Sequence, residues 1–242
     1  MRVSVLIVIP TYNEIANLPV IVERVRKEAP TAHLLIVDDT SPDGTGELAD
    51  RLAASDASIH VMHRREKDGL GRAYVAGFEW GLARDYDVLV QMDGDLSHNP
   101  SDVPRLVDAL KSSDLVLGSR YVTDGGTVNW GIGRQLLSRG GSLYARTILG
   151  LPIRDVTGGF KAWKASTLRA VNLSSIRSNG YSFQVEMTYR VACLGLNIKE
   201  VPIIFADRVD GVSKMSKKIV VEAMLMVWRL RFTRKEQWQK QS

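Results

Sequence analysis

The chain has 242 residues, of which 45% are hydrophobic and 24% are charged, a composition that is ordinary for a globular protein and excludes a disordered one. A single cysteine, Cys193, excludes an internal disulfide and fits a reducing, cytoplasmic location. The net charge of +5 is concentrated in residues 208–242, which carry nine Lys and Arg against three acids. This distribution favours a local anionic partner, either a phosphate or a membrane face, and argues against a nucleic-acid-binding surface.

The first apolar run, at 3–9, follows a basic residue, as the apolar part of a signal peptide does. It leads into T-Y-N-E rather than into a small-residue cleavage site, so we expect a first buried strand there. No segment of the sequence approaches the roughly 20 apolar residues that span a bilayer. The sequence therefore predicts no transmembrane helix.

Further apolar runs predict four more strands, at 34–37, 59–62, 88–92 and 115–117. The runs are nearly continuous, as expected for strands that are covered on both faces. Segments with apolar residues at helical spacing lie between them, at 15–28, 73–82 and 103–110. This alternation predicts the α/β class, with one Rossmann-like domain whose mostly parallel, twisted sheet has helices on both faces.

A polar cluster follows each predicted strand, at 11–14, 38–45, 64–71, 93–98 and 118–121. Ligands of such sheets bind at the carboxyl ends of the strands, so we expect these five loops to form one site. We find no linker that would separate two folded domains. The boundaries that we predict are a catalytic domain at 1–213 and a basic amphipathic helix and tail at 214–242.

The segment Q-M-D-G-D-L-S-H at 91–98 places Asp93 and Asp95 one residue apart at a strand end. Their repulsion would be removed by Mg²⁺ or Mn²⁺, which take carboxylate ligands and complete their shell with phosphate oxygens. A solvated turn is the alternative, and D-x-D alone does not decide between the two. A calcium EF-hand is excluded because His98, and not glycine, stands at the sixth position.

Two acids, Asp38 and Asp39, end the second apolar run. Turn chemistry explains Pro42, Asp43 and Gly44, but it does not explain two carboxylates at a strand end. The carboxylate of Asp39 could accept hydrogen bonds from the N–H edge of a nucleobase.

Five motifs occur in order: V-I-P-T-Y-N-E, I-V-D-D-T-S-P-D-G-T, Q-M-D-G-D-L-S-H, G-S-R-Y and T-G-G-F-K. Together they resemble the family-2 inverting glycosyltransferases of GT-A fold, and among these the dolichol-phosphate (polyprenol-phosphate) mannose synthases. The resemblance runs from about residue 3 to residue 217. It implies mannosyl transfer from GDP-mannose to a polyprenyl phosphate, with Mg²⁺ or Mn²⁺ as cofactor.

The resemblance also implies roles for individual residues. The metal would be held by Asp93, Asp95 and Ser97, the last of which stands where some relatives carry Gln. The donor would be bound by Pro10, Tyr12, Asn13, Glu14, Val37, Asp39, Asp93, Gly94 and Asp95.

A lipid phosphate carries up to about two negative charges near neutral pH and is already a nucleophile, so the acceptor side needs no strong base. Arginine suits this side, since its fork of donors matches phosphate oxygens. The resemblance places acceptor-phosphate binding at Arg120, Arg134, Ser138, Arg208 and Lys214, with Asp95, Arg120 and Arg208 as the catalytic residues. An ordinary surface ion pair is the alternative for each arginine.

Two later segments have two interpretations each. S-F-Q-V-E-M at 182–187 predicts a helix start capped by Ser182, whereas the resemblance would place Gln184 and Glu186 near the sugar. The segment 219–232, flanked by basic residues, could pack on the core or lie on an anionic leaflet with Trp228 and Phe232 inserted. We expect a peripheral protein on the cytosolic face of a membrane, with a membrane-anchored partner protein as a further expectation.

Three alternatives to mannosyl transfer differ in class. A related enzyme could transfer glucose or another hexose from a UDP-sugar. A haloacid-dehalogenase-like phosphohydrolase would use Asp93 as nucleophile, but that fold carries its motif on an early strand and here it follows the fourth. A non-catalytic membrane adaptor that relies on the basic C-terminus would not explain the five polar loops.

Overall fold

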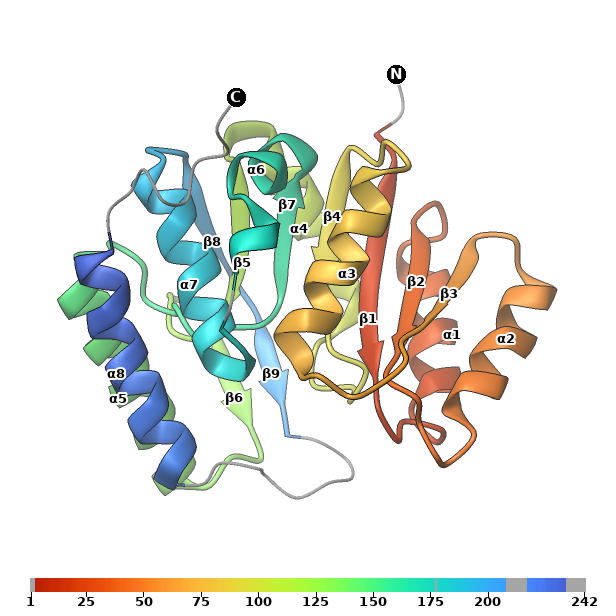
Figure 1. The fold of residues 1–242 in the computed structure, drawn as a ribbon, viewed down its shortest axis with the longest axis horizontal. Coiled ribbons are helices and arrows are strands. Elements are labelled where there is room, and N and C mark those ends of the chain that lie inside the picture. The colour runs from red at the N-terminus through yellow and green to blue at the C-terminus, as the bar shows by residue number, and fades with distance from the viewer. Residues whose placement is uncertain (1–2, 177, 208–216, 234–242) are drawn as a thin grey trace.

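The computed structural model describes residues 3–176, 178–207 and 217–233. It is an α/β protein in which nine strands alternate with helices in this part of the chain (Figure 1). The strands are β1 Val5–Thr11, β2 His33–Asp38, β3 Ile59–His63, β4 Val88–Gln91, β5 Leu115–Ser119, β6 Gly126–Val128, β7 Lys161–Lys164, β8 Ile198–Pro202 and β9 Ile204–Ala206. The α-helices are α1 Leu18–Glu28, α2 Thr45–Ser55, α3 Leu70–Leu82, α4 Val103–Ala109, α5 Ile132–Leu149, α6 Ala165–Ala170, α7 Gly180–Cys193 and α8 Lys217–Phe232.

Seven strands form one sheet in the order β3-β2-β1-β4-β7-β5-β8. All neighbours are parallel except β7, which runs antiparallel to both β4 and β5. The remaining strands, β6 and β9, pair in a separate parallel ribbon. The register sets Thr11 opposite Asp38 and Val8 opposite Gln91, so the loops after β1, β2 and β4 meet at one edge of the sheet. We call this edge the carboxyl edge.

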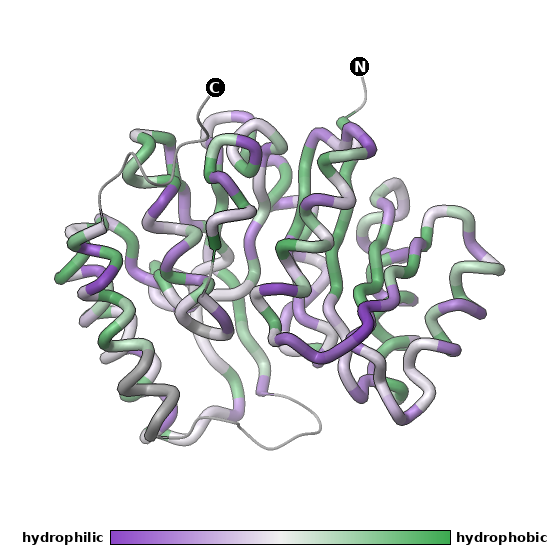
Figure 2. The backbone as a smooth tube through the Cα atoms, viewed as in Figure 1, coloured by the Kyte–Doolittle hydropathy of each residue, from purple (hydrophilic) through white to green (hydrophobic). Residues whose placement is uncertain are grey.

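Alternate residues of each central strand enter two separate cores. Leu6 and Val8 of β1 face a core that contains side chains of α3, α5, α6, α7 and α8, whereas Ile7 and Ile9 face a core with α1, α2 and α4. Figure 2 shows these inner strands largely in the hydrophobic colour. Burial on both faces explains why the sequence of β1 is a continuous apolar run rather than an alternating one.

Glycines bring helix α3 unusually close to the sheet. A Cβ atom at Gly77 would lie 2.4 Å from Val8 Cγ1, and one at Gly81 would lie 2.7 Å from Leu6 and Leu89 side chains. No real side chain fits at these distances. The spacing of the two glycines, one helical turn, therefore fixes the face that α3 presents to β1 and β4.

Helices α5 and α8 lie side by side at the end of the molecule beyond α7 (Figure 1). Val227 and Leu230 of α8 are buried, and the Tyr144 hydroxyl of α5 donates to the Met224 carbonyl at 3.2 Å. Trp228 and Phe232 remain exposed. Helix α8 thus packs on the core with one face and leaves aromatic side chains on another.

The structure confirms all five predicted strands and changes four details. Helix α1 begins at Leu18, three residues later than predicted. The α7 helix begins at Gly180 with Asn179 as N-cap and no side-chain cap bond, so the predicted cap at Ser182 is wrong. Helix α3 begins at Leu70, three residues earlier than predicted. The sheet also gains β7 and β8, which the sequence did not predict. In the described ranges, no helix has the length and apolar character needed to cross a membrane.

Candidate active site

The carboxyl edge gathers the loops that follow β1, β2 and β4. Pro10 and Val37 are paired in register near the ends of β1 and β2. The backbone N–H of Asn13, a residue with φ of 61°, donates to the Ser41 hydroxyl at 3.1 Å. The Glu14 N–H donates to the Thr45 hydroxyl at 3.0 Å. Asn13 and Glu14 therefore tie the first loop to the second.

Tyr12 and Glu14 also have side-chain contacts at this edge. The Lys67 ammonium lies 3.3 Å from the centre of the Tyr12 ring, a cation–π contact across from the loop after β3. The Glu14 carboxylate accepts a hydrogen bond from the Asn17 amide at 2.7 Å. The first of these contacts joins Tyr12 of the predicted donor pocket to the loop after β3.

The two acids that end β2 have different surroundings. Asp38 is bound by its own turn, accepting hydrogen bonds from the Thr11 hydroxyl at 3.1 Å and from Ser41 at 2.5 and 3.0 Å. Asp39 forms an ion pair with Arg64 at 2.6 Å. Burial raises the pKa of Asp39, and the positive charge of Arg64 opposes the rise. A nucleobase at Asp39 would therefore meet a carboxylate that one guanidinium already orients.

Asp93 is held by Tyr74 and His98. The Tyr74 hydroxyl donates to Asp93 Oδ1 at 2.6 Å, and burial together with the Asp93 charge raises the pKa of Tyr74 well above its usual value. The backbone N–H of Asp93 donates to His98 Nδ1 at 3.0 Å. Because Nδ1 accepts this bond, the ring proton of a neutral His98 is assigned to Nε2. His98 Nε2 lies 4.0 Å from Asp93 Oδ2. The orientation of Asp93 is thus fixed from two sides.

Asp95 is almost fully buried, with 7% of its surface exposed. Its Oδ1 accepts hydrogen bonds from the Ser97 N–H at 3.1 Å and from the Ser97 hydroxyl at 2.5 Å. Between them, Leu96 has φ of 64°, in the left-handed region that costs a side-chain-bearing residue about 1 kcal/mol. Ser97 therefore supports the Asp95 carboxylate, and its role as a metal ligand stays a prediction.

The chemistry of these donors fits a hard divalent cation. Asp93 and Asp95 supply carboxylate oxygens from one turn, and oxygen ligands are those that Mg²⁺ and Mn²⁺ prefer. Within the described ranges, no group of three or more His, Cys, Asp or Glu side chains is placed to hold a metal by itself. An ion at this turn would therefore draw the rest of its ligands from water and from the phosphates of a bound nucleotide.

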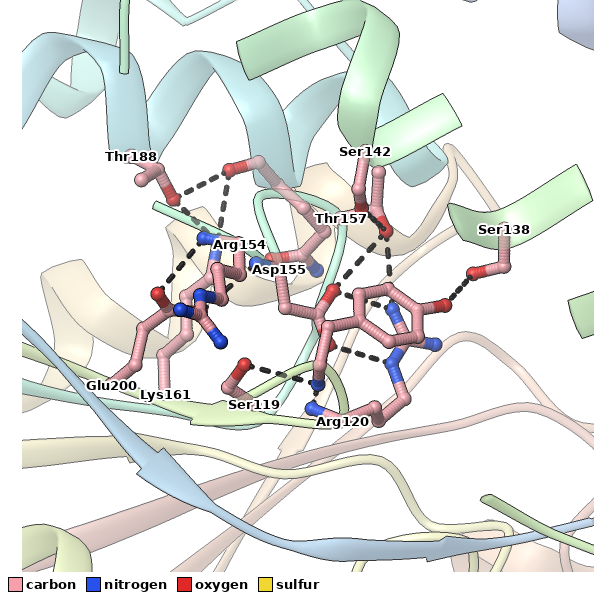
Figure 3. Close-up of polar contacts among 12 residues, drawn as sticks. Ser119, Arg120, Ser138, Ser142, Arg154, Asp155, Thr157, Lys161, Thr188 and Glu200 are labelled. Atoms are coloured by element: carbon pink, nitrogen blue, oxygen red, sulfur yellow. Dashed lines mark hydrogen bonds and ion pairs between the residues drawn. The ribbon is translucent and has the colours of Figure 1, made fainter. Parts of the chain in front are cut away.

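Arg120 is buried at the carboxyl end of β5, where it forms a two-point ion pair (Figure 3). Its Nε and Nη2 each donate to Asp155 at 2.7 Å, and its backbone N–H donates to the same carboxylate at 3.0 Å. Nη2 also donates to the Thr157 hydroxyl at 3.1 Å. The N–H of Asp155 in turn donates to Glu200 at 2.9 Å. Asp155 had not been singled out from the sequence.

A cavity of about 130 Å³ brings three of the predicted acceptor-binding residues together. Arg120, Arg134 and Ser138 line it, along with apolar side chains of α5, α7 and α8 that include Leu137, Val185, Met224 and Val227. We call it the α5–α8 cavity. The two other predicted residues, Arg208 and Lys214, lie outside the described residues. Guanidinium groups beside an apolar lining suit a ligand that joins an anion to a hydrocarbon chain.

Side chains around the α5–α8 cavity hold its polar residues in place. The guanidinium of Arg134 forms an ion pair with Asp207 and lies 4.2 Å from the centre of the Trp130 ring. The Ser138 hydroxyl accepts a hydrogen bond from the Tyr121 hydroxyl at 2.6 Å. Trp130 was not predicted, because aromatic residues in loops carry no periodic signal, and Tyr121 stood in the G-S-R-Y motif without a predicted role.

A row of aromatic rings joins the carboxyl edge to this cavity. The ring of His98 lies 5.4 Å from that of Phe205, and the Phe205 ring lies 5.4 Å from that of Trp130. The ring of His98 also stacks on that of Phe160, with the ring centres 4.7 Å apart. Since His98 contacts Asp93 and Trp130 contacts Arg134, the predicted metal-binding turn and the cavity are parts of one packed unit.

Lys161, from the T-G-G-F-K motif, is fully buried in β7. Its ammonium donates to the Gln184 carbonyl and the Thr188 hydroxyl, each at 2.9 Å (Figure 3). Burial lowers the pKa of Lys161 to about 7, and the charge of Asp155 opposes the fall. Its place at the end of the T-G-G-F-K motif was the available sequence signal for this residue.

Gln184 and Glu186, which the resemblance placed near the sugar, point to different surroundings. The Gln184 side-chain oxygen accepts a hydrogen bond from the Gln91 amide at 2.8 Å. Gln184 Nε2 and Asp93 Oδ2 both lie near Gly159, at 3.6 and 3.5 Å from where a Cβ atom of that residue would be. Glu186 is buried and bound by Arg190 and the Ser178 hydroxyl. Of the two, Gln184 is the residue that lies beside the predicted metal-binding turn.

Comparison with known proteins identifies the family. Residues 6–171 match the model of glycosyl transferase family 2. The chain is 56% identical, over 93% of both chains, to an undecaprenyl-phosphate mannosyltransferase from Micrococcus luteus. It belongs to glycosyl transferase family 2. A second relative, a polyprenol monophosphomannose synthase from Mycolicibacterium smegmatis, is 50% identical to this chain. The match covers 93% of this chain and 87% of the synthase.

Solved structures confirm the predicted GT-A fold. A glucosyl-3-phosphoglycerate synthase from Mycobacterium tuberculosis, in complex with Mn²⁺, UDP and glucosyl-3-phosphoglycerate, has a TM-score of 0.65 at 20% identity, covering 94% of this chain and 78% of that chain. A mannosyltransferase from Pyrobaculum calidifontis, in complex with GDP-Man and Mn²⁺, has a TM-score of 0.57 at 16% identity, covering 87% and 58%. Membership of a glycosyltransferase family rules out the phosphohydrolase and adaptor alternatives.

Proposed function

We propose that the protein transfers mannose from GDP-mannose to a polyprenyl phosphate, giving polyprenyl β-D-mannosyl phosphate and GDP with inversion. The observation that carries this proposal is that two relatives named for polyprenyl-phosphate mannosyl transfer share at least half of the sequence over almost the whole chain. The position of the acidic turn next to a cavity lined by arginines and apolar side chains supports it.

On the donor side, Asp93 and Asp95 would bind Mg²⁺ or Mn²⁺ together with the diphosphate of GDP-mannose. The ion, when bound, supplies Lewis-acid stabilisation of the leaving diphosphate. The nucleoside would lie against the first two loops, with its base at Asp39, in a pocket formed by Pro10, Tyr12, Asn13, Glu14, Val37, Asp39 and Gly94. Gly94 itself packs against the end of β1, where a Cβ atom would lie 3.4 Å from Ile9 Cγ2 and from the Pro10 carbonyl oxygen.

On the acceptor side, the lipid phosphate would enter the α5–α8 cavity with its hydrocarbon chain along the apolar lining. Arg134 and Ser138 would bind its oxygens there, joined by Arg208 and Lys214, while Arg120, anchored by Asp155, lines the same cavity. A phosphate oxygen then attacks the anomeric carbon from the face opposite GDP. The guanidinium groups offset the repulsion between the two phosphate groups, and no general base is needed because the attacking oxygen is already anionic.

Neither the base nor the sugar is fixed by the residues of the donor pocket. A polyprenyl-phosphate hexosyltransferase that uses UDP-glucose would present the same acidic turn. Calorimetric titration with GDP and with UDP distinguishes the two, and we expect GDP to bind more tightly. The protein would act as a peripheral protein on the cytosolic face of a membrane, where polyprenyl phosphate is anchored, and a membrane-anchored partner protein remains a prediction.

The test is incubation of the purified protein with radiolabelled GDP-mannose and a short-chain polyprenyl phosphate in detergent. We expect label to enter the lipid fraction, to be lost on addition of a chelator and to return with added Mg²⁺ or Mn²⁺. Radiolabelled UDP-glucose serves as the matched control. Label from UDP-glucose instead of GDP-mannose would overturn the donor assignment, and no labelled lipid from either donor would overturn the proposed function.

A further inference from the structure

A second cavity lies on the outer side of helix α5, next to the α5–α8 cavity but separate from it. Its volume is about 370 Å³, and it is lined by Tyr121, Arg139, Leu143, Arg146 and Arg154. We call it the arginine cavity. Tyr121 forms the wall between the two, since its hydroxyl bonds to Ser138 in one cavity and its ring lies 5.6 Å from the Arg139 guanidinium in the other.

The arginine cavity has three guanidinium groups and no carboxylate in its lining. The nearby acids are already bound elsewhere. Asp155 pairs with Arg120, and Glu200 accepts hydrogen bonds from the backbone N–H groups of Arg154 and Asp155. In the part of the chain that the structure describes, none of the three arginines of this cavity forms an ion pair. Three like charges around one cavity favour an anion between them, and arginine matches the oxygens of a phosphate group.

Apolar side chains on the same stripe of α5 indicate where that phosphate comes from. Ile132, Leu136, Arg139, Leu143 and Arg146 follow one another at spacings of three and four residues, so they share one face of the helix. The three apolar members of this stripe are exposed by 78%, 66% and 55%. The whole of α5 contains three arginines and no acid. Exposed apolar and basic side chains on one helix face are typical of a helix that lies on an anionic membrane.

Helix α8 continues this face. Leu225, Trp228 and Phe232 are exposed on α8, which packs against α5, and Arg229 stands among them. Figure 1 shows the two helices packed together as the outer layer at this end of the molecule. The α5–α8 cavity lies between these helices and α7. A membrane against this surface would therefore bring a lipid-borne phosphate to the cavity that we propose for the acceptor.

We propose that the arginine cavity binds the phosphodiester headgroup of an anionic membrane phospholipid and so seats the α5–α8 surface on the leaflet. This inference rests on the proposed function, because an acceptor anchored in the membrane requires this surface to face the lipid. The bound headgroup is not the acceptor. It occupies the outer side of Tyr121 while the acceptor phosphate occupies the inner side.

Co-sedimentation of the full chain with vesicles tests the proposal. The probes are phosphatidylcholine vesicles with and without phosphatidylglycerol, and the variant is the double change Arg139→Gln and Arg146→Gln. We expect wild-type protein to prefer the anionic vesicles and the variant to bind them roughly 30-fold more weakly, since each basic residue near an anionic surface contributes about a factor of five. The matched control is Arg24→Gln with Arg51→Gln, which removes the same charge from exposed positions on α1 and α2.

Two further measurements keep the outcomes distinct. Mannosyl transfer to a short acceptor in detergent should be unchanged in the Arg139/Arg146 variant, which also shows that the variant folds. Equal weakening by the Arg24/Arg51 control, or full binding by the Arg139/Arg146 variant, would overturn the proposal. A different outcome would reassign the cavity to a free phosphate. In that outcome inorganic phosphate protects the wild-type chain, but not the variant, against thermal unfolding, and the wild-type chain shows no preference for anionic vesicles. If the wild-type chain binds the anionic vesicles but transfers no mannose, the proposed function alone is refuted.

Discussion

Arg120 and Lys161 are both buried cations, but their charges are compensated in different ways. Arg120 has a carboxylate, Asp155, at two-point hydrogen-bond distance. Lys161 instead donates to the Gln184 carbonyl and the Thr188 hydroxyl, which are neutral acceptors. A neutral acceptor does not offset the loss of hydration of an ammonium group, and the pKa of Lys161 falls to about 7 for this reason.

The lowered pKa of Lys161 predicts how stability changes with pH. Above pH 7 the folded chain releases this proton while the unfolded chain, with an ordinary lysine pKa of 10.5, keeps it. The free energy of unfolding therefore rises as pH increases from about 7 to 10, by up to about 1.4 kcal/mol per pH unit. Below pH 7 both states are protonated and this contribution is constant.

Lys161→Met should remove that rise, as measured by urea denaturation at pH 6, 7, 8 and 9. The Thr188 hydroxyl still donates to the Gln184 carbonyl at 3.0 Å, so the variant leaves no new unpaired group there. The control is Lys164→Met, a partly exposed lysine of the same strand that pairs with Asp114. A pH slope in Lys161→Met equal to that of the control would show that Lys161 does not titrate in this range.

The Arg120–Asp155 pair is expected to be essential for folding as well as for the site. Asp155→Asn leaves the guanidinium buried without a countercharge, a change that costs about 3–5 kcal/mol. The expected result is a large fall in the denaturation midpoint in urea. Asp108→Asn, which removes an exposed ion pair with Lys111, should cost less than about 1 kcal/mol. Comparable losses in the two variants would contradict the assigned importance of the buried pair.

Asp95→Ala tests the acidic turn. The carboxylate is buried and accepts two hydrogen bonds from Ser97 of its own turn, and we expect its loss to leave the fold intact and to abolish turnover. Loss of a phosphate-side charge of this kind raises the barrier by about 3 kcal/mol or more, which corresponds to a rate at least about 100-fold lower. The measurement is mannosyl transfer beside circular dichroism, with the exposed Asp108→Ala as control. A rate near that of the wild type would refute the role of Asp95 at the metal.

At the residue scale, local motifs were predictable and distant pairings were not. Asp93 and Asp95 stood out because two acids one residue apart end an apolar run. Asp155 did not stand out, because its role depends on its ion pair with Arg120, which lies 35 residues away in the sequence. Ser97 was predicted as a ligand from its place in the motif; its hydroxyl donates to the Asp95 carboxylate, and its role at the metal stays a prediction.

At the scale of elements, the contact between α3 and the sheet is the one most sensitive to a single methyl group. Gly77→Ala places a Cβ atom 2.4 Å from Val8 Cγ1, so helix and strand must separate, at a cost of about 1–3 kcal/mol. Gly140→Ala is the matched change on α5, where nothing lies within 4 Å, and should stabilise by about 0.5–1 kcal/mol. Thermal unfolding of both variants checks the signs. Stabilisation by Gly77→Ala would show that the close approach does not exist.

The elements that the sequence predicted are those with long, continuous apolar runs or clear helical spacing. Strands β1 to β5 and helices α1, α3 and α4 belong to this group. Strand β7 escaped prediction because its four residues, K-A-W-K, have lysines at both ends. Its antiparallel place between β4 and β5 depends on partners that are distant in sequence. The three-residue strands β6 and β9 are too short to show any period.

At the scale of the whole molecule, the fold places the acidic turn and the α5–α8 cavity side by side. The acidic turn follows β4 at the carboxyl edge, where β1, β2 and β4 end. Arg120, at the end of β5, lines the α5–α8 cavity. The row formed by His98, Phe205 and Trp130 connects them through direct ring contacts. Family and fold could be read from five ordered motifs, but this juxtaposition required the arrangement of α5, α7 and α8 in space.

The most direct test of the account is a crystal structure of the protein with Mn²⁺ and GDP, with the metal located by its anomalous scattering. The account predicts a manganese peak between the Asp93–Asp95 turn and the diphosphate, with guanine near Asp39 and the α5–α8 cavity open beside the β-phosphate. A manganese ion or nucleotide bound away from this turn, with Asp93 and Asp95 contacting neither, would contradict it.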